Sequence, residues 1–174
     1  MRFFIIISFF ILLTSAVLSE ENIQNSIESD EIEYLNETGE LKALGSVRIT
    51  RENFQLEADE IIFNQKNNII EGVGNVVIKE KSGSTILASK FKLSSDLSDG
   101  IIEMPTLLTK EGINISSAYA IRSGSKSTVL KKGIFSPCQN CKNSKEKPSW
   151  QVKANRIIYD EDNGNIIYEG ARFE

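Results

Sequence analysis

The chain contains the segment Ala58-Asp59-Glu60-Ile61-Ile62-Phe63-Asn64, a polar stretch from Gln65 to Asn68, and then Ile69-Ile70-Glu71-Gly72-Val73-Gly74-Asn75-Val76-Val77-Ile78. In both apolar segments β-branched and aromatic residues alternate with charged or small ones. Alternation with a period of two is typical of β-strands, and Asn, Asp, Gly and Ser are typical of the turns between them. The segment therefore predicts two strands joined by a short turn.

The same order of residues recurs along the chain. Equivalent segments begin at Asp30, Asp59, Ser89, Ala118 and Asn155, so that successive starts are separated by 29, 30, 29 and 37 residues. Units of this length that each contact mainly their neighbours are typical of stacked repeat architectures. Helical spacing of apolar residues is nearly absent after the N-terminal segment. We therefore predict an all-β protein, built as a repeated meander of strands.

Glycine recurs inside the second strand of the repeat, at Gly45, Gly72, Gly74 and Gly170. A residue without a Cβ allows a strand to bend or bulge, and regular bends curl a sheet into a trough. We expect a curved β-jellyroll or solenoid that has an apolar inner face and an open strand at each end.

The period of two also assigns side chains to faces of the predicted sheet. Ile61 and Phe63 share one face of their strand, and Ile70, Val76 and Ile78 share one face of the next. On the opposite faces we expect Glu60, Asn64 and Lys79. The inner side chains either close into a filled core or leave an open slot, and periodicity alone does not distinguish these two interiors.

The first residues predict export. Arg2 precedes an apolar run from Phe3 to Leu13, and small and polar residues follow it. This order is typical of a secretory signal peptide, which is helical and is removed from the mature protein. A membrane anchor is the alternative, but it needs about 20 predominantly apolar residues. We predict a signal peptide over residues 1–19 and one β-jellyroll domain over 20–174, with a cysteine-containing insertion at about 133–150.

Composition argues against several functional classes. The chain has 20 Lys plus Arg against 24 Asp plus Glu, and it has no basic stripe interleaved with aromatic residues, so nucleic acid is not expected as a partner. It contains no histidine. Ser-His-Asp and Cys-His catalysis and histidine-containing zinc sites are therefore excluded. Two cysteines cannot supply the four ligands of a structural zinc site. We predict neither an enzyme nor a metal or cofactor site.

The repeat resembles that of the OstA-like family, which includes the periplasmic lipopolysaccharide bridge protein LptA and the N-terminal region of LptD. The similarity rests on the segment from Ala58 to Phe63 and on its return strand from Gly72 to Ile78, and it extends from Ser29 to about Leu130. It implies a non-enzymatic apolar trough that carries the acyl chains of lipopolysaccharide. The residues that it implies as lipid-binding are Ile61, Phe63, Ile70, Val76, Ile78, Phe91 and Leu93.

A second stretch is more similar to LptD than to LptA. It comprises Cys138-Gln139-Asn140-Cys141 and then Pro148-Ser149-Trp150-Gln151-Val152-Lys153-Ala154. This resemblance implies that the chain is a fragment without the LptD barrel, located on the periplasmic face of the outer membrane. It also implies the barrel and its LptE-type lipoprotein plug as partners. We expect an LptA-type bridge protein to dock on the N-terminal edge strand, near Glu31 to Leu35.

Cys138 and Cys141 are expected to be oxidised, because an exported protein reaches an oxidising compartment. They either pair with each other or bond cysteines elsewhere in a longer protein, and the LptD resemblance supports a disulfide role. A redox-active pair would be expected at the start of a helix, and the polar residues around this motif predict none. Trp150 is interpreted as a core or edge anchor rather than a ligand platform.

Two other functions are consistent with the sequence. The chain is suitable in length for a complete LptA-like periplasmic bridge protein. Alternatively, it is a generic exported β-solenoid scaffold that binds protein through a strand edge and binds no lipid. The cysteine and Trp150 segment argues against the first alternative, and copurified lipid would argue against the second.

Overall fold

The computed structural model describes residues 25–124, 127–137, 150–160 and 163–174. Within these residues all regular structure is β-strand and there is no helix. The predicted all-β class is thus confirmed. The described residues contain no helix that is long and apolar enough to span a membrane. The predicted signal peptide, Cys138 and Cys141 lie outside the described residues, so their roles stay predictions.

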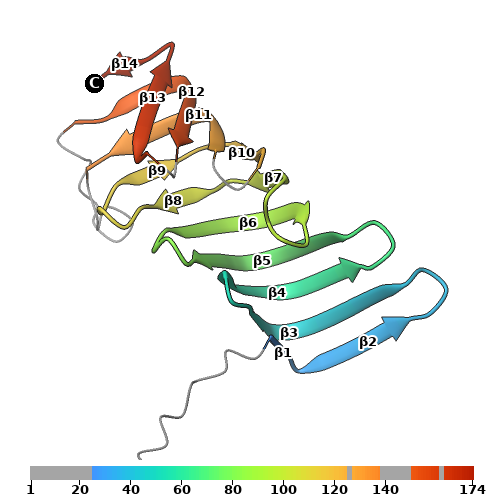
Figure 1. The fold of residues 1–174 in the computed structure, drawn as a ribbon. Coiled ribbons are helices and arrows are strands. Elements are labelled where there is room, and N and C mark those ends of the chain that lie inside the picture. The colour runs from blue at the N-terminus through green and yellow to red at the C-terminus, as the bar shows by residue number, and fades with distance from the viewer. Residues whose placement is uncertain (1–24, 125–126, 138–149, 161–162) are drawn as a thin grey trace, which may run out of the picture.

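The strands form one antiparallel sheet that runs the length of the molecule (Figure 1). Their bounds are β1 (Ser26–Glu28), β2 (Glu31–Leu35), β3 (Glu40–Thr50), β4 (Phe54–Asn64), β5 (Ile69–Glu80), β6 (Thr85–Ser94), β7 (Gly100–Glu103), β8 (Thr106–Leu108), β9 (Asn114–Ser116), β10 (Tyr119–Arg122), β11 (Ser127–Ser136), β12 (Val152–Asp160), β13 (Asn165–Glu169) and β14 (Arg172–Phe173). β11 continues through Ser136, so the first residues of the predicted cysteine-containing insertion belong to this strand, and the extent of the insertion stays a prediction.

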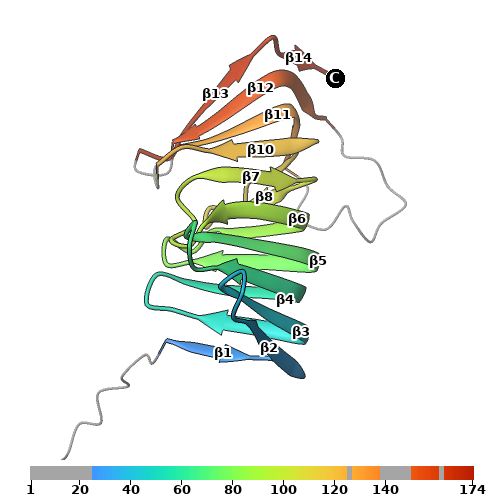
Figure 2. The same ribbon diagram turned by 90° about the vertical axis from the view of Figure 1, so that its right-hand side faces the viewer.

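The long strands change partners part-way along their length. The first half of β3 pairs with β2 and its second half pairs with β1. Likewise, one half of β6 pairs with β7 and the other half with β8, and β12 pairs with both β13 and β14. The sheet is therefore folded along its length into two arms, as the views in Figures 1 and 2 show. The first arm holds β2, β7, β10 and β13, and the second holds β1, β8, β9 and β14.

The bends that separate the arms require unusual backbone geometry. Gly45, Gly74 and Gly170 have φ values of +74°, +78° and +62°. A Cβ at Gly45 would collide with the carboxylate of Asp30, which lies between β1 and β2, and a Cβ at Gly74 would collide with the carboxylate of Asp59 in β4. These glycines thus bend the strands as predicted. Gly72 differs, because it lies in the first arm under the ring of Phe91, which a Cβ would strike.

The space between the arms contains the hydrophobic core. On the first arm, residues in register across neighbouring strands form one inner row, which is Ala43, Ile61, Gly72, Phe91, Ile102, Ala120, Leu130 and Ile157. On the second arm the facing row is Ile49, Leu56, Ile78, Ile86, Leu107 and Ile115. These aliphatic and aromatic side chains are buried. In the central strands, therefore, side chains fill the interior instead of leaving an open slot.

Candidate functional site

An apolar groove opens between the arms at the N-terminal end of the sheet. Its first-arm wall contains Ile61, Phe63 and Ile70, and its second-arm wall contains Ile27 and Ile49. The cavity has a volume of about 200 Å³. The complete lining is Asn25, Ser26, Ile27, Leu41, Ile49, Thr50, Arg51, Ile61, Phe63 and Ile70. The groove has apolar walls and a polar rim at Thr50 and Arg51.

The groove is open because the sheet formed by the described residues ends here. Among these residues, β2 pairs only with β3, and β1 pairs only with β3. Ile32 of β2 lies in register with Ala43 of the inner row, and Tyr34 with Leu41. Both Ile32 and Tyr34 nevertheless expose 49% of their surface. An inner face that would be covered in a longer stack thus stays accessible at this end.

The residues implied as lipid-binding all lie on the inner faces of the arms, but some line the open groove and others are buried in the core. Ile61, Phe63 and Ile70 line the N-terminal groove. The others are deeply buried members of the core and do not line this groove: Val76, Ile78, Phe91 and Leu93. The sequence pattern did not single out Ile27, Leu41 or Ile49, although alternation within their strands could have placed them on the same inner face.

Farther along, a loop and an ion pair close the open side between the arms. The loop between β6 and β7 carries Leu97, which is 3% exposed. Arg122 at the end of β10 donates to Glu80 at the end of β5, with Nη1 and Oε1 2.5 Å apart. A polar hollow of about 250 Å³ lies at this closure and is lined by Asn53, Phe54, Glu80, Lys81, Ser82, Asp96, Leu97, Ser98 and Arg122. No sequence motif predicted this pairing.

Aromatic side chains cluster at the C-terminal end of the sheet. Trp150 stacks on Phe173 at a centroid distance of 5.5 Å and contacts Phe135 at 5.6 Å. Phe135 also meets Tyr168 edge to face. Burial raises the pKa of the Tyr168 hydroxyl, as expected in an apolar surrounding. Trp150 therefore anchors the last strands to one another, in agreement with its interpretation as an edge or core anchor.

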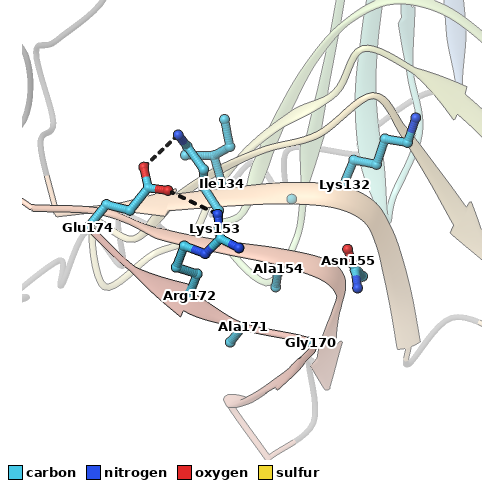
Figure 3. A pocket seen from close by; sticks show the side chains of 10 residues that line it. Lys132, Ile134, Lys153, Ala154, Asn155, Gly170, Ala171, Arg172 and Glu174 are labelled. Carbon is cyan, nitrogen blue, oxygen red and sulfur yellow. Dashed lines mark hydrogen bonds and ion pairs between the residues drawn. The ribbon is translucent and has the colours of Figure 1, made fainter.

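A larger cavity of about 460 Å³ lies near the bend of the last strands, outside the core (Figure 3). Its charged side chains include Lys132, Lys153, Arg172 and Glu174. Lys153 and Glu174 form an ion pair of 2.6 Å, and this hydrogen bond holds the pKa of the Glu174 carboxyl below its usual value. The cations here are partly neutralised and there is little apolar wall, so this cavity is not suited to a hydrocarbon chain.

A family model described as the LptA and LptD N-terminal domain of lipopolysaccharide transport proteins matches residues 26–167. The chain belongs to this family. The resemblance to OstA-like proteins that the repeats indicated is thereby confirmed. The match covers the two-armed sheet from β1 into β13, which includes every residue of the N-terminal groove except Asn25.

The chain is also similar to proteins named LPS-assembly protein LptD. The LPS-assembly protein LptD of Nitrosococcus oceani is 28% identical over 149 residues, which are 84% of this chain and 19% of that protein. LptD of Pseudomonas putida strain GB-1 is 29% identical over 114 residues, 65% of this chain and 12% of that protein. The chain thus spans about a fifth or less of the length of these relatives.

Among solved structures, the chain is similar to LptH of Pseudomonas aeruginosa, described as the LptA-homologous periplasmic component of the lipopolysaccharide transport device. The two share 10% sequence identity and a TM-score of 0.48, over 83% of this chain and 81% of LptH.

Proposed function

We propose that this chain takes part in lipopolysaccharide transport to the outer membrane, as a non-enzymatic carrier that shelters acyl chains between its two arms. The observation that supports this function is the apolar groove lined by Ile61, Phe63 and Ile70, in a chain of the LptA and LptD N-terminal family. The acyl chains would lie against these side chains, and the sugar headgroup would stay in water beyond the polar rim. Transport of this kind makes and breaks no covalent bond.

The free energy of transfer explains why such a carrier is needed. Exposure of hydrocarbon to water costs about 0.8 kcal/mol per CH₂, so a chain of about a dozen carbons costs on the order of 10 kcal/mol. A lipid with several such chains cannot cross an aqueous compartment freely. An apolar surface that covers even part of each chain lowers this cost in proportion to the area covered.

The groove alone is smaller than the roughly 300–1,000 Å³ of pockets that enclose a whole small molecule. At about 200 Å³ it covers only a part of a multi-chain lipid. We infer that the lipid is held by several such surfaces in succession. The open N-terminal strands favour this arrangement, because an unpaired edge can add a strand from another protein.

The proposed partner at this edge is an LptA-type bridge protein. β2 is exposed along its whole length, and in the part of the chain that the structure describes it pairs on one side only. A further strand on β2 would continue the inner row beyond Ile32 and Tyr34 and would cover both side chains. The proposed C-terminal partners are those that the resemblance to LptD implies, the barrel and its LptE-type lipoprotein, and the proposed location is the periplasmic face of the outer membrane.

The test of lipid binding is a charge placed in the groove. Lipopolysaccharide that carries a photoactivatable diazirine on an acyl chain is incubated with the protein, and covalent labelling is measured after illumination. The substitution Phe63→Glu should lower labelling about tenfold, because an unpaired carboxylate in an apolar site is costly to desolvate. Phe63 is suitable because it is only partly buried and packs at the margin of the core.

The matched control is Ile62→Glu, which adds the same charge on the same strand. Ile62 lies in register with Lys42 and Glu71 on the outer face of the first arm. This variant should be labelled like the wild type, and circular dichroism should show that both variants keep their strands. Equal labelling of all three proteins would refute the groove as the lipid site.

A further inference from the structure

The loop from Ser95 to Asp99, here called the plug loop, connects β6 to β7 and closes the middle of the space between the arms. Leu97 is its only apolar residue, and this side chain is 3% exposed. Leu97 has a φ of +61°, in the left-handed region that non-glycine residues rarely adopt. The backbone is thus held in an unfavourable conformation that turns one leucine into the core.

Polar contacts position the plug loop from both arms. The amide of Ser95 donates to the carbonyl of Asn68, and the hydroxyl of Ser95 donates to the Asn68 side chain at 2.7 Å. From the second arm, Arg51 donates to the carbonyl oxygen of Ser95 at 3.2 Å. The amide of Gly124 donates to the Asp99 carboxylate. The loop is therefore fastened at its margins by hydrogen bonds, while a single side chain enters the core.

The ion pair between Glu80 and Arg122, here called the clasp, joins the two arms beside this loop. Glu80 ends β5 in the second arm and Arg122 ends β10 in the first arm. The two side chains are only 13% and 5% exposed, and Arg122 Nε is buried without a hydrogen-bond partner. Along the sheet, β6 and β7 lie between β5 and β10. The arginine thus reaches across the strands that the plug loop connects.

We propose that the plug loop and the clasp form a gate in the side of the trough, and that an acyl chain gains access to the central interior by taking the place of Leu97. This inference rests on the proposed lipid-carrier function. With the gate closed, acyl chains contact the N-terminal groove but do not reach the central side chains, which are buried and packed. With the plug loop displaced, the space vacated by Leu97 would join the groove to the core around Phe91 and Leu93.

Two features make this loop suited to movement. Release of Leu97 would relieve the strain of its left-handed backbone conformation. The other residues of the loop are polar, so they lose no apolar contacts when they enter water. The clasp is a buried charged pair beside a polar hollow, and Arg122 Nε has no hydrogen-bond partner, so water admitted by opening would solvate both side chains. In contrast, β6 and β7 on either side of the loop are held by ladders of backbone hydrogen bonds to β5 and β10.

The experiment locks the plug loop with a removable disulfide. Asn68→Cys and Ser95→Cys are introduced together, in a background where Cys138→Ser and Cys141→Ser remove the native thiols. Diazirine-labelled lipopolysaccharide is photolysed with the oxidised and the reduced protein, and the labelled peptides are identified by mass spectrometry. In the oxidised form, labelling of peptides from β6 and β8 should fall about tenfold relative to the reduced form, because the open state is no longer populated.

Labelling of groove peptides that contain Phe63 separates this proposal from the proposed function. Groove labelling should be equal in both forms. If groove peptides are labelled but labelling of the β6 and β8 peptides is the same in the oxidised and reduced protein, the gate proposal is wrong and the carrier function stands. If no peptide is labelled in any form, the carrier function itself fails, and the gate fails with it.

A second variant opens the gate instead of locking it. Leu97→Gly removes the side chain that fills the core at a position where glycine adopts the positive φ without strain. It should raise labelling of the β6 and β8 peptides. The matched control is Met104→Gly, because Met104 also has positive φ, +48°, but is 64% exposed and lies outside the core. Met104→Gly should leave labelling unchanged, and equal effects of the two variants would overturn the gate.

Discussion

Single residues at the bends define the two-armed shape. Gly45 and Gly74 adopt positive φ, and each faces an aspartate: Asp30 between β1 and β2, and Asp59 in β4. Asp59 also accepts two hydrogen bonds from the side chain of Asn75, which itself has positive φ. Glycine is needed at these bends both for backbone freedom and for the space occupied by the facing carboxylate.

Substitution of a bend glycine should lower stability both through backbone strain and through a clash with the facing carboxylate. Gly74→Ala should lower the free energy of unfolding by about 2–3 kcal/mol, because alanine adds left-handed strain and a clash with Asp59. Gly164→Ala should cost only about 1 kcal/mol, since Gly164 has a φ of +64° but no atom within 4 Å of its added Cβ. Urea denaturation measures both values. Equal losses would show that the facing carboxylate moves aside freely.

Among the structural elements, the plug loop depends most on polar contacts. The Asp96 carboxylate accepts hydrogen bonds from the hydroxyls of Ser94 and Ser98 and from the amide of Ser98. These bonds lower the pKa of Asp96 below its ordinary value of 3.8, with the Ser94 hydroxyl as the largest cause. They hold the turn that presents Leu97 to the core.

The lowered pKa of Asp96 gives a defined dependence of stability on pH. A carboxyl group whose pKa is lower in the folded state stabilises the protein above its unfolded pKa, and the effect is lost as pH falls through the folded pKa. Asp96→Asn should therefore be less stable than the wild type at pH 7. The difference should shrink as pH falls below the ordinary value of 3.8. Thermal unfolding at several pH values measures this, and a constant difference down to pH 2 would indicate a purely steric effect.

The molecule as a whole is a stack in which each strand contacts the strands beside it. Its centre depends on large buried side chains such as Phe91, which is fully inaccessible. Its only tryptophan, Trp150, lies near the C-terminal end and contacts Phe135 and Phe173. Tryptophan fluorescence therefore reports on one end of the stack, while circular dichroism reports on all strands.

This separation leads to a prediction about cooperativity. Phe91→Ala should lower the midpoint of unfolding by circular dichroism, with a loss of about 3–5 kcal/mol from the cavity that it leaves. The fluorescence transition of Trp150 should shift less, because a stack is stabilised mainly through neighbouring contacts. The two transitions should coincide in the wild type, where the core is continuous. Coincident transitions in the variant would show that the sheet unfolds as one unit.

Much of this architecture could be predicted from local patterns. Alternation with a period of two identifies strands and assigns side chains to a face, so Ile61, Phe63 and Ile70 were placed on the inner face correctly. The recurring glycines identified the bends at Gly45, Gly74 and Gly170, because a left-handed backbone restricts the residue type. Gly72 was misinterpreted as a bend, since a glycine required by a facing aromatic ring looks the same in sequence.

By itself, then, the sequence determined the all-β class, the repeated bends and the inner face, since each depends on residues close together in the chain. Only the tertiary structure decided which part of the interior is open. Glu80 and Arg122 are 42 positions apart, and their pairing depends on how the arms face each other. Leu97 is one apolar residue in a polar turn, and the alternation of apolar and polar residues along strands does not predict that it is buried. The groove is open because side chains fill the interior at the central strands, whereas no further strand among residues 25–174 that the structure describes covers the end strands β1 and β2.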